Sequence, residues 1–190
     1  MTFEYSATQF KATDSLNHVV TVTYAGGSTA YDEIAYQGYG GAARTIRVFR
    51  TTLEHALQTG FSLTRLHDLF PTLNGSGSTT TNYDTDVVSG VQLPDGRQYQ
   101  FRYNNYGELA RVDLPTDGAM EYDHLPYKGA GPGDGGVVTA SVEYAIYRRV
   151  VGRRVLDSDG TIRSKTNFSR PDDSSPALHV VWTVAACSGF

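Results

Sequence analysis

Residues 131–136 are the first candidate for chemistry, because they match the G-x-G-x-x-G pattern of dinucleotide-binding loops. In that motif a strand leads into the loop and a helix follows, so that backbone N–H groups and the helix dipole hold a pyrophosphate. Here Pro132 and Asp134 lie inside the pattern, and the strand formers Val137-Val138-Thr139 come next. We therefore interpret the segment as a loop between strands and predict no cofactor.

The segment Asp157-Ser158-Asp159-Gly160 resembles a fragment of a calcium-binding loop. A complete EF-hand loop has a glycine at its sixth position, an oxygen ligand at the first and a glutamate at the twelfth. With Gly160 as the sixth residue, Val155 and Thr166 occupy the two ends, and neither fits. We interpret the segment as a polar hairpin turn, with weak calcium binding as the alternative.

Acidic and nucleophilic side chains are scattered along the chain. Glycoside hydrolysis needs two carboxyl groups held across a cleft, and the sequence marks no such pair among Glu108, Asp113 and Glu121, which we expect to face solvent.

Cys187 lies in an apolar segment, where packing is expected rather than reaction. No two histidines have the spacing of a helical metal site. We predict no catalytic residue and no metal site. A hydrolase that uses two carboxylates is kept as a third hypothesis, after the structural and carbohydrate-binding hypotheses given below. The histidines are His18, His55, His67, His124 and His179.

Tyrosines form the most visible aromatic pattern. Tyr99, Phe101 and Tyr103 alternate with glutamine and arginine, and Tyr106 follows at a turn. If exposed, these four rings would be a stacking surface for sugar rings. If buried, they are the inward face of a sheet, and the alternation with polar residues favours burial.

Arginine pairs occur at Arg148-Arg149 and Arg153-Arg154, beside Tyr147. We interpret them as the solvated face or the turn of a strand pair. An anion-binding patch is the alternative, because guanidinium groups bind carboxylates and phosphates in bidentate fashion.

The elements that would position these residues are short antiparallel strands. Gly96, Gly107, Gly118 and Gly129 are each separated by 11 residues, and segments with period-two alternation lie between them. Asp95-Gly96 and Asp117-Gly118 are hairpin-turn dipeptides, because both residue types tolerate positive φ. Turns at this spacing predict an all-β antiparallel sheet of hairpins.

The pattern also repeats over a longer period. Leu93-Pro94 recurs as Leu114-Pro115, 21 residues later, and Tyr83-Asp84, Tyr103-Asn104 and Tyr122-Asp123 are spaced by 20 and 19 residues. A unit of about two strands is therefore predicted to recur every ~20 residues, as in stacked repeat architectures.

The segment from Leu93 to Asp123 resembles the YD repeat of the Rhs (rearrangement hot spot) family. Residues 147–160 resemble a second, more degenerate copy, and Tyr31-Asp32 belongs to a possible third. The good match covers about a sixth of the chain. The positions that fill the repeat pattern are Gly96, Tyr99, Tyr103, Asn104, Gly107, Leu109, Gly118, Tyr122, Asp123, Tyr147, Gly152 and Gly160.

The resemblance implies a ribbon of β-hairpins that spirals into a shell. In the family, such a shell encloses a polymorphic toxin domain or forms part of a large bacterial cell-surface protein. The partners expected on this basis are neighbouring repeats of a parent chain, with an enclosed toxin or a cell-surface carbohydrate as further possibilities. The sequence departs from the family at one point, since the Asp-Pro signature of the boundary before the toxin is absent.

Four segments are expected along the chain. Residues 1–72 form a mostly-β segment with degenerate repeats, 73–82 a Gly/Ser/Thr-rich loop, 83–166 the YD-repeat hairpins, and 167–190 a linker and an atypical apolar tail. Residues 53–70 fit either a helical stripe or strands, and we predict strands from their neighbours. The few repeats and the tail suggest a fragment, a truncated reading frame or the N-terminal portion of a larger array.

Composition excludes several functional classes. The net charge of −4 argues against a nucleic-acid binder and against a polybasic membrane contact. No apolar run reaches the ~18 residues of a membrane helix, and no signal peptide is visible, so the localisation stays open, with the cell surface expected for an Rhs-type parent. The main hypothesis is a structural repeat segment without catalysis. The alternative is a carbohydrate-binding β-sandwich that uses exposed tyrosines.

Overall fold

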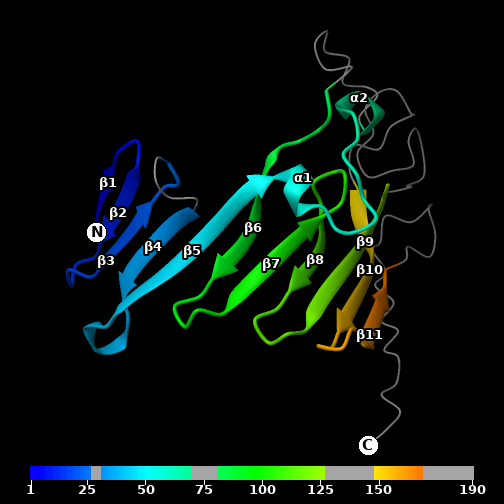
Figure 1. Ribbon diagram of the computed structural model, residues 1–190. Helices are drawn as coiled ribbons and strands as arrows, with labels where there is room; N and C mark the ends of the chain where they lie inside the picture. The colour runs from blue at the N-terminus through cyan, green and yellow to red at the C-terminus, as the bar shows by residue number, and fades with distance from the viewer. Residues whose placement is uncertain (27–30, 70–80, 127–147, 169–190) are drawn as a thin grey trace, which may run out of the picture.

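The computed structural model describes residues 1–26, 31–69, 81–126 and 148–168 (Figure 1). Within these ranges the chain forms eleven strands, two α-helical turns and one 3-10 turn. The strands are β1 (Thr2–Tyr5), β2 (Gln9–Thr13), β3 (Val19–Thr23), β4 (Tyr31–Gln37), β5 (Ala43–Thr52), β6 (Asp86–Gln92), β7 (Gln98–Tyr103), β8 (Leu109–Asp113), β9 (Ala119–Pro126), β10 (Arg148–Leu156) and β11 (Ile162–Asn167). The helical turns are η1 (Tyr39–Gly41), α1 (Leu53–Ala56) and α2 (Leu66–Leu69).

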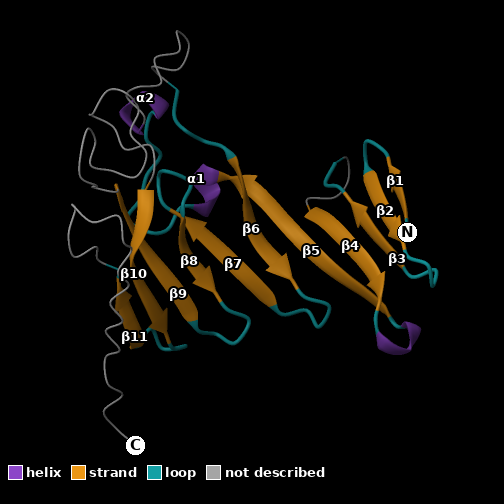
Figure 2. Cartoon of the chain, turned by 180° about the vertical axis from the view of Figure 1, so that it is seen from behind, coloured by secondary structure: helices purple, strands orange, loops and turns teal. Residues whose placement is uncertain are grey.

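All eleven strands belong to one open antiparallel sheet, and each strand pairs with its neighbours in chain order. The views from both sides show this sheet as a single layer, with α1 and α2 near one end of the central strands (Figures 1 and 2). Strands β1 and β11 are its two edges. The predicted all-β antiparallel hairpin architecture is confirmed. Strands β5 and β6 pair with each other, although the predicted loop of residues 73–82 lies between them in the sequence.

One kind of tight turn joins many of these strands. In six turns of the described ranges, the first residue donates its N–H to the carbonyl four residues on, and the fourth residue donates its N–H back to the carbonyl of the first. The fourth residue has a left-handed φ in all six, which the Gly/Asx-rich sequence allows at low cost. These left-handed residues are Asn17, Gly41, Gly96, Gly107, Asp117 and Gly160.

Asp117 corrects a detail of the glycine pattern. The equal spacing of 11 residues suggests that Gly118 is the turn residue, like Gly96 and Gly107. Instead Asp117 has the left-handed φ of 67°, and the carbonyl of Gly118 accepts the closing hydrogen bond from Leu114. Gly118 is required for another reason: a Cβ at this position would lie 2.9 Å from the carbonyl oxygen of Leu156, which is backbone and cannot move aside cheaply.

The two faces of the sheet differ in chemistry. Residues directly opposite one another share a face, and residues two apart along a strand do as well. The register therefore places apolar side chains from β2 to β10 on one side, here called the apolar face. These are Phe10, Val22, Ile34, Ile46, Val48, Val91, Tyr99, Phe101, Val112, Met120 and Val155.

The opposite side, here called the polar face, carries charged and amide side chains. Its members include the facing pairs Glu4–Lys11, Glu33–Arg47 and Arg111–Glu121, and the last pair continues to Arg154 on β10. Sheets with one apolar and one polar face normally cover the apolar one. Within the described ranges no second layer does so, and the side chains of the apolar face are half-buried or exposed.

The prediction of strands for residues 53–70 is wrong within the described part, 53–69, because α1 and α2 are helical; Phe70 lies outside it. In α1 the apolar spacing of Leu53 and Ala56 buries both side chains completely, next to β5, β6 and β7. The N–H groups at its start are satisfied by the chain that leads into β6, since Glu54 donates to Asp84 Oδ1 at 2.9 Å. A helical turn forms here because it buries two side chains that an extended chain would point to opposite sides.

Candidate functional site

The most connected group of side chains lies on the polar face and is here called the arginine–carboxylate cluster: Arg111 and Asp113 on β8, Glu121 and Asp123 on β9, and Arg154 on β10. Arg111 Nε donates to Asp113 Oδ1 at 2.7 Å, and Arg111 Nη1 donates to Glu121 Oε1 at 2.9 Å. Arg154 continues the chain of ion pairs to the next two carboxylates, with Nε 3.0 Å from Glu121 Oε2 and Nη2 2.9 Å from Asp123 Oδ1. The cluster therefore links three consecutive strands.

Glu121 is at the centre of this cluster. Its side chain is only 15% exposed, and it accepts from two guanidinium groups and from Gln58 Nε2 at 3.4 Å. Gln58 follows α1, and its N–H donates to the carbonyl of Tyr103 at the end of β7. Glu121 thus ties the segment after α1 to the middle of the sheet.

The electrostatics agree with this geometry. The hydrogen bond from Arg154 lowers the pKa of Asp123 below its ordinary value, against the opposing effect of partial burial. The same hydrogen bond raises the pKa of Arg154 further above that of free arginine. Both groups are therefore held in their charged forms.

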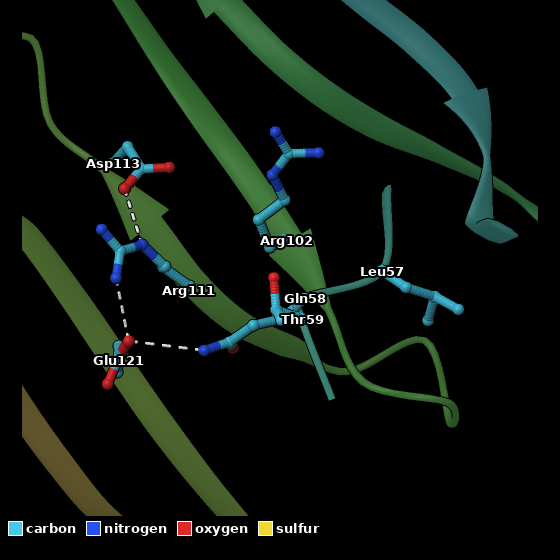
Figure 3. A pocket seen from close by; sticks show the side chains of 7 residues that line it. All are labelled: Leu57, Gln58, Thr59, Arg102, Arg111, Asp113 and Glu121. Carbon is cyan, nitrogen blue, oxygen red and sulfur yellow. Dashed lines mark hydrogen bonds and ion pairs between the residues drawn. The ribbon is translucent and has the colours of Figure 1, made fainter. Parts of the chain in front are cut away.

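A pocket of about 510 Å³ opens beside the cluster, between residues 57–59 and strands β7–β9 (Figure 3). One of its lining residues is the apolar Leu57, and the others are Gln58, Thr59, Arg102, Arg111, Asp113 and Glu121. Figure 3 shows Arg111 joined to Asp113 and Glu121 on one side, with the guanidinium group of Arg102 on β7 apart from these three. The pocket is thus a polar concavity lined by four charged side chains.

The expectation that Glu108, Asp113 and Glu121 face solvent is wrong for Glu108 and Glu121, whereas Asp113 is partly exposed. Their side chains are 20%, 35% and 15% exposed, and each accepts from an arginine. Glu108 pairs with Arg148, whose Nε lies 3.0 Å from both of its carboxylate oxygens. Only Glu121 faces its arginine across a strand pair; Asp113 pairs with Arg111 on the same strand, and Glu108 pairs with Arg148 two strands away.

The arginine pairs of β10 are likewise not a solvated face. The Arg148 side chain is 13% exposed, and its guanidinium lies 3.8 Å from the centre of the Tyr106 ring. The Arg154 side chain is 24% exposed and belongs to the arginine–carboxylate cluster. Both Arg148 and Arg154 are neutralised by carboxylates of this chain, which argues against the alternative of an anion-binding patch at these two positions.

The four aromatic residues considered for ligand stacking do not form one surface. Tyr99, Phe101 and Tyr103 share the apolar face and are half-buried. The hydroxyl of Tyr103 donates to the carbonyl of Val88 at 2.6 Å, which anchors this ring against β6. Tyr106 lies in the turn beneath Arg148 instead.

Among the residues of the repeat pattern, Asn104 has a clear local role. It is 4% exposed, and its Oδ1 accepts from the N–H groups of Tyr106 and Glu108 at 2.9 and 3.1 Å. Its Nδ2 donates to Glu108 Oε2 at 2.6 Å. Asn104 therefore holds the turn that Gly107 closes, and Leu109 begins the next strand after it.

The three tyrosine pairs of the 20-residue pattern occupy different places. Tyr83-Asp84 precedes β6, Tyr103-Asn104 lies at the end of β7, and Tyr122-Asp123 lies within β9. By contrast, Leu93-Pro94 and Leu114-Pro115 both open the same kind of turn. The Leu-Pro pairs thus occupy equivalent positions in two turns, whereas the tyrosine pairs do not occupy equivalent positions. Tyr147 lies outside the described residues.

Gly152 and Gly160 have separate roles. Gly152 is buried opposite Asp123, where a Cβ would lie 2.8 Å from Asp123 Oδ2. Gly160 has a left-handed φ of 82° in the turn between β10 and β11. In that turn Asp159 Oδ1 accepts the N–H of Thr161 at 2.8 Å, and Asp157 pairs with Arg163. Both carboxylates thus serve the predicted hairpin turn.

No group of three or more His, Cys, Asp or Glu residues is placed to hold a metal ion within the described ranges. His18 Nδ1 lies 2.8 Å from Asp14 Oδ2, and His55 Nδ1 lies 3.0 Å from Thr52 Oγ1. His179, Cys187 and the glycine-rich residues 131–136 lie outside these ranges. The helices of the described part are too short to cross a membrane.

Two features escape the sequence analysis. One is the bond from Gln58 to Glu121, which joins residues 63 positions apart, so no local pattern signals it. The other is the contact of Arg111 with Glu121, for which a signal exists: both lie on polar positions of strands joined by the turn at Asp117. Counting outward from that turn places them opposite each other.

No protein-family model matches the sequence, and no curated protein matches it significantly.

Proposed function

We propose that this chain is a structural segment of β-hairpin repeats, of the type that the resemblance to Rhs-family YD repeats implies, and that it forms part of the wall of a larger β assembly without catalysing a reaction. The observation that carries this proposal is the open eleven-strand sheet, one face of which is mainly apolar from β2 to β10. Within the described ranges, nothing covers the apolar side of this single layer and neither of its edge strands has an outer partner. Further hairpin repeats of a parent chain would supply what is missing.

The polar face supports the same proposal. Its ion pairs connect successive strands, as between Glu33 and Arg47 and across the arginine–carboxylate cluster. Cross-strand pairs of opposite charge stabilise a sheet without needing a second layer. This face therefore suits the outside of a wall, and the apolar face suits its covered side.

The alternative of a β-sandwich has less support. A sandwich packs two sheets face to face, whereas the described residues form one sheet. The four aromatic residues proposed for stacking are also divided between the apolar face and the turn beneath Arg148.

A urea titration of the purified chain, followed by far-UV circular dichroism and by aromatic fluorescence, tests the proposal. A single layer without its own covered core is expected to give shallow transitions that do not coincide, and self-association that increases with concentration. A steep, coincident transition of a monomer would contradict the proposal, because the chain would then be an autonomous domain.

A further inference from the structure

Arg102 differs from the other arginines around the arginine–carboxylate cluster. It lies directly opposite Arg111 across the β7–β8 pair, on the same face of the sheet. Arg111 is neutralised by Asp113 and Glu121, whereas Arg102 has no ion-pair partner within the described ranges. Like charges directly opposite each other destabilise a sheet. The pocket lining as a whole is neutral, with two arginines and two carboxylates, but Arg102 is the one guanidinium group of this lining that is not in an ion pair within the described ranges.

The rest of the pocket is suited to hydroxyl groups. Six of its seven lining residues are polar, so it does not match the apolar character of most drug-like sites. Asp113 uses its Oδ1 to bind Arg111, and its side chain is 35% exposed. A carboxylate oxygen accepts more than one hydrogen bond, so Asp113 can also accept from a ligand hydroxyl. Thr59 is exposed at the rim and adds a hydroxyl group.

We propose that this pocket binds a carboxylated sugar, such as a hexuronic acid. The carboxylate of the sugar pairs with the guanidinium of Arg102, and ring hydroxyls donate to Asp113. The volume of about 510 Å³ has room for a monosaccharide ring. The proposal rests on the polar face alone, and it holds whether the chain is a repeat segment or an autonomous domain.

The test is a titration of the ¹⁵N-labelled chain with glucuronate, glucose and acetate, followed through arginine Nε–Hε and backbone amide signals. Glucuronate is expected to saturate and to shift signals of Arg102, Asp113 and residues 57–59. Glucose lacks the charge and acetate lacks the hydroxyls, so each is expected to bind at least about tenfold more weakly, the effect of losing one charge-assisted hydrogen bond.

Arg102→Gln is the decisive variant, because it removes the charge without breaking a side-chain hydrogen bond or ion pair within the described ranges. Glucuronate affinity is expected to fall at least about tenfold. Arg102→Lys keeps the charge but not the planar fork, and intermediate affinity is expected. Arg44→Gln is the matched control: Arg44 is an exposed arginine on β5 that does not line this pocket, and the substitution should leave affinity unchanged.

Three results would overturn the proposal. They are the absence of saturable binding to the folded chain, equal affinity for glucuronate and acetate, and unchanged affinity in Arg102→Gln. Equal affinity for acetate would define a plain anion site. The backbone amide spectrum of each variant establishes that it is folded before affinities are compared.

Discussion

Replacement of Glu121 by glutamine tests whether the arginine–carboxylate cluster holds the centre of the sheet together. The side chain of Glu121 is 15% exposed and accepts hydrogen bonds from Arg111, Arg154 and Gln58. Glutamine has nearly the same shape but no charge, and it replaces one acceptor oxygen by an NH2 donor. Both guanidinium groups therefore lose the charge of Glu121, and one of them faces a donor, while Asp113 and Asp123 still pair with them.

The expected cost follows from the burial of the partners. A hydrogen bond to a charged group contributes about 1.5–3 kcal/mol, and breaking a fully buried ion pair costs about 3–5 kcal/mol. The two arginine side chains are 32% and 24% exposed, so water recovers part of the loss. We expect Glu121→Gln to destabilise β8–β10 by about 2–3 kcal/mol.

Glu33→Gln is the matched control on the same face. Glu33 pairs with Arg47 at 3.4 Å, and the two side chains are 37% and 42% exposed. Exposed pairs of this kind contribute about 0–1 kcal/mol, so little change is expected in β4 and β5.

Native-state amide hydrogen exchange measures both effects, because it reports the local free energy of opening even where global unfolding is not cooperative. The slowest amides of β8–β10 should exchange faster in Glu121→Gln, and those of β4–β5 should change little in Glu33→Gln. Equal effects of the two substitutions would refute the reasoning, because burial of the pair would then not determine its contribution.

Three further predictions concern single residues elsewhere in the sheet. Gly160→Ala should destabilise the β10–β11 hairpin by about 1 kcal/mol, because the residue has a left-handed φ although no atom lies near an added Cβ. Gly26→Ala is the control: an added Cβ also meets no atom there and the φ is not left-handed, so amide hydrogen exchange rates should change little. Burial raises the pKa of Tyr103 above 10.0. The contribution of the neutral Tyr103 to stability is therefore present below pH 10.0 and is lost as the pH rises through the raised pKa. In a tyrosinate absorbance titration, Tyr103→Phe should lose one group that titrates late. A hydrogen bond from the N–H of Ala25 and then the ion pair with Arg50 lower the pKa of Asp32 below 3.8. The contribution of the ionised Asp32 to stability is therefore present above pH 3.8 and is lost as the pH falls through the lowered pKa. NMR titration of this carboxyl group and hydrogen exchange in Asp32→Asn measure the effect, and an unshifted titration would contradict the argument.

Much of the sheet was predictable because its causes are local. The alternation of Tyr99, Phe101 and Tyr103 with polar residues follows from the pleat of a strand, which requires no knowledge of the partner. The turns at Gly96 and Gly107 follow from the ease with which glycine adopts positive φ. Asp117 shows the limit of such reasoning, because an Asp-Gly pair offers two residues that tolerate this conformation, and the strand pairing selects between them.

The arginine–carboxylate cluster was only partly predictable. An unpaired residue at Ala110 shifts the register of β7 against β8, and another at Val151 shifts β9 against β10. Such bulges move side chains by one position relative to the neighbouring strand. Whether Arg154 faces Glu121 or its neighbour therefore depends on bulges whose positions the alternation pattern does not show.

The sequence by itself determined the strands from β7 to β9, the turns that join them and the division of their residues between an apolar and a polar side. These features depend on backbone conformation over a few residues. Only the tertiary structure decided that residues 53–56 are helical, that Gln58 reaches Glu121, and that Arg102 lies opposite Arg111 at a pocket. Those contacts join segments distant in the sequence, and burial and register, which act between strands rather than along them, determine which side chains meet.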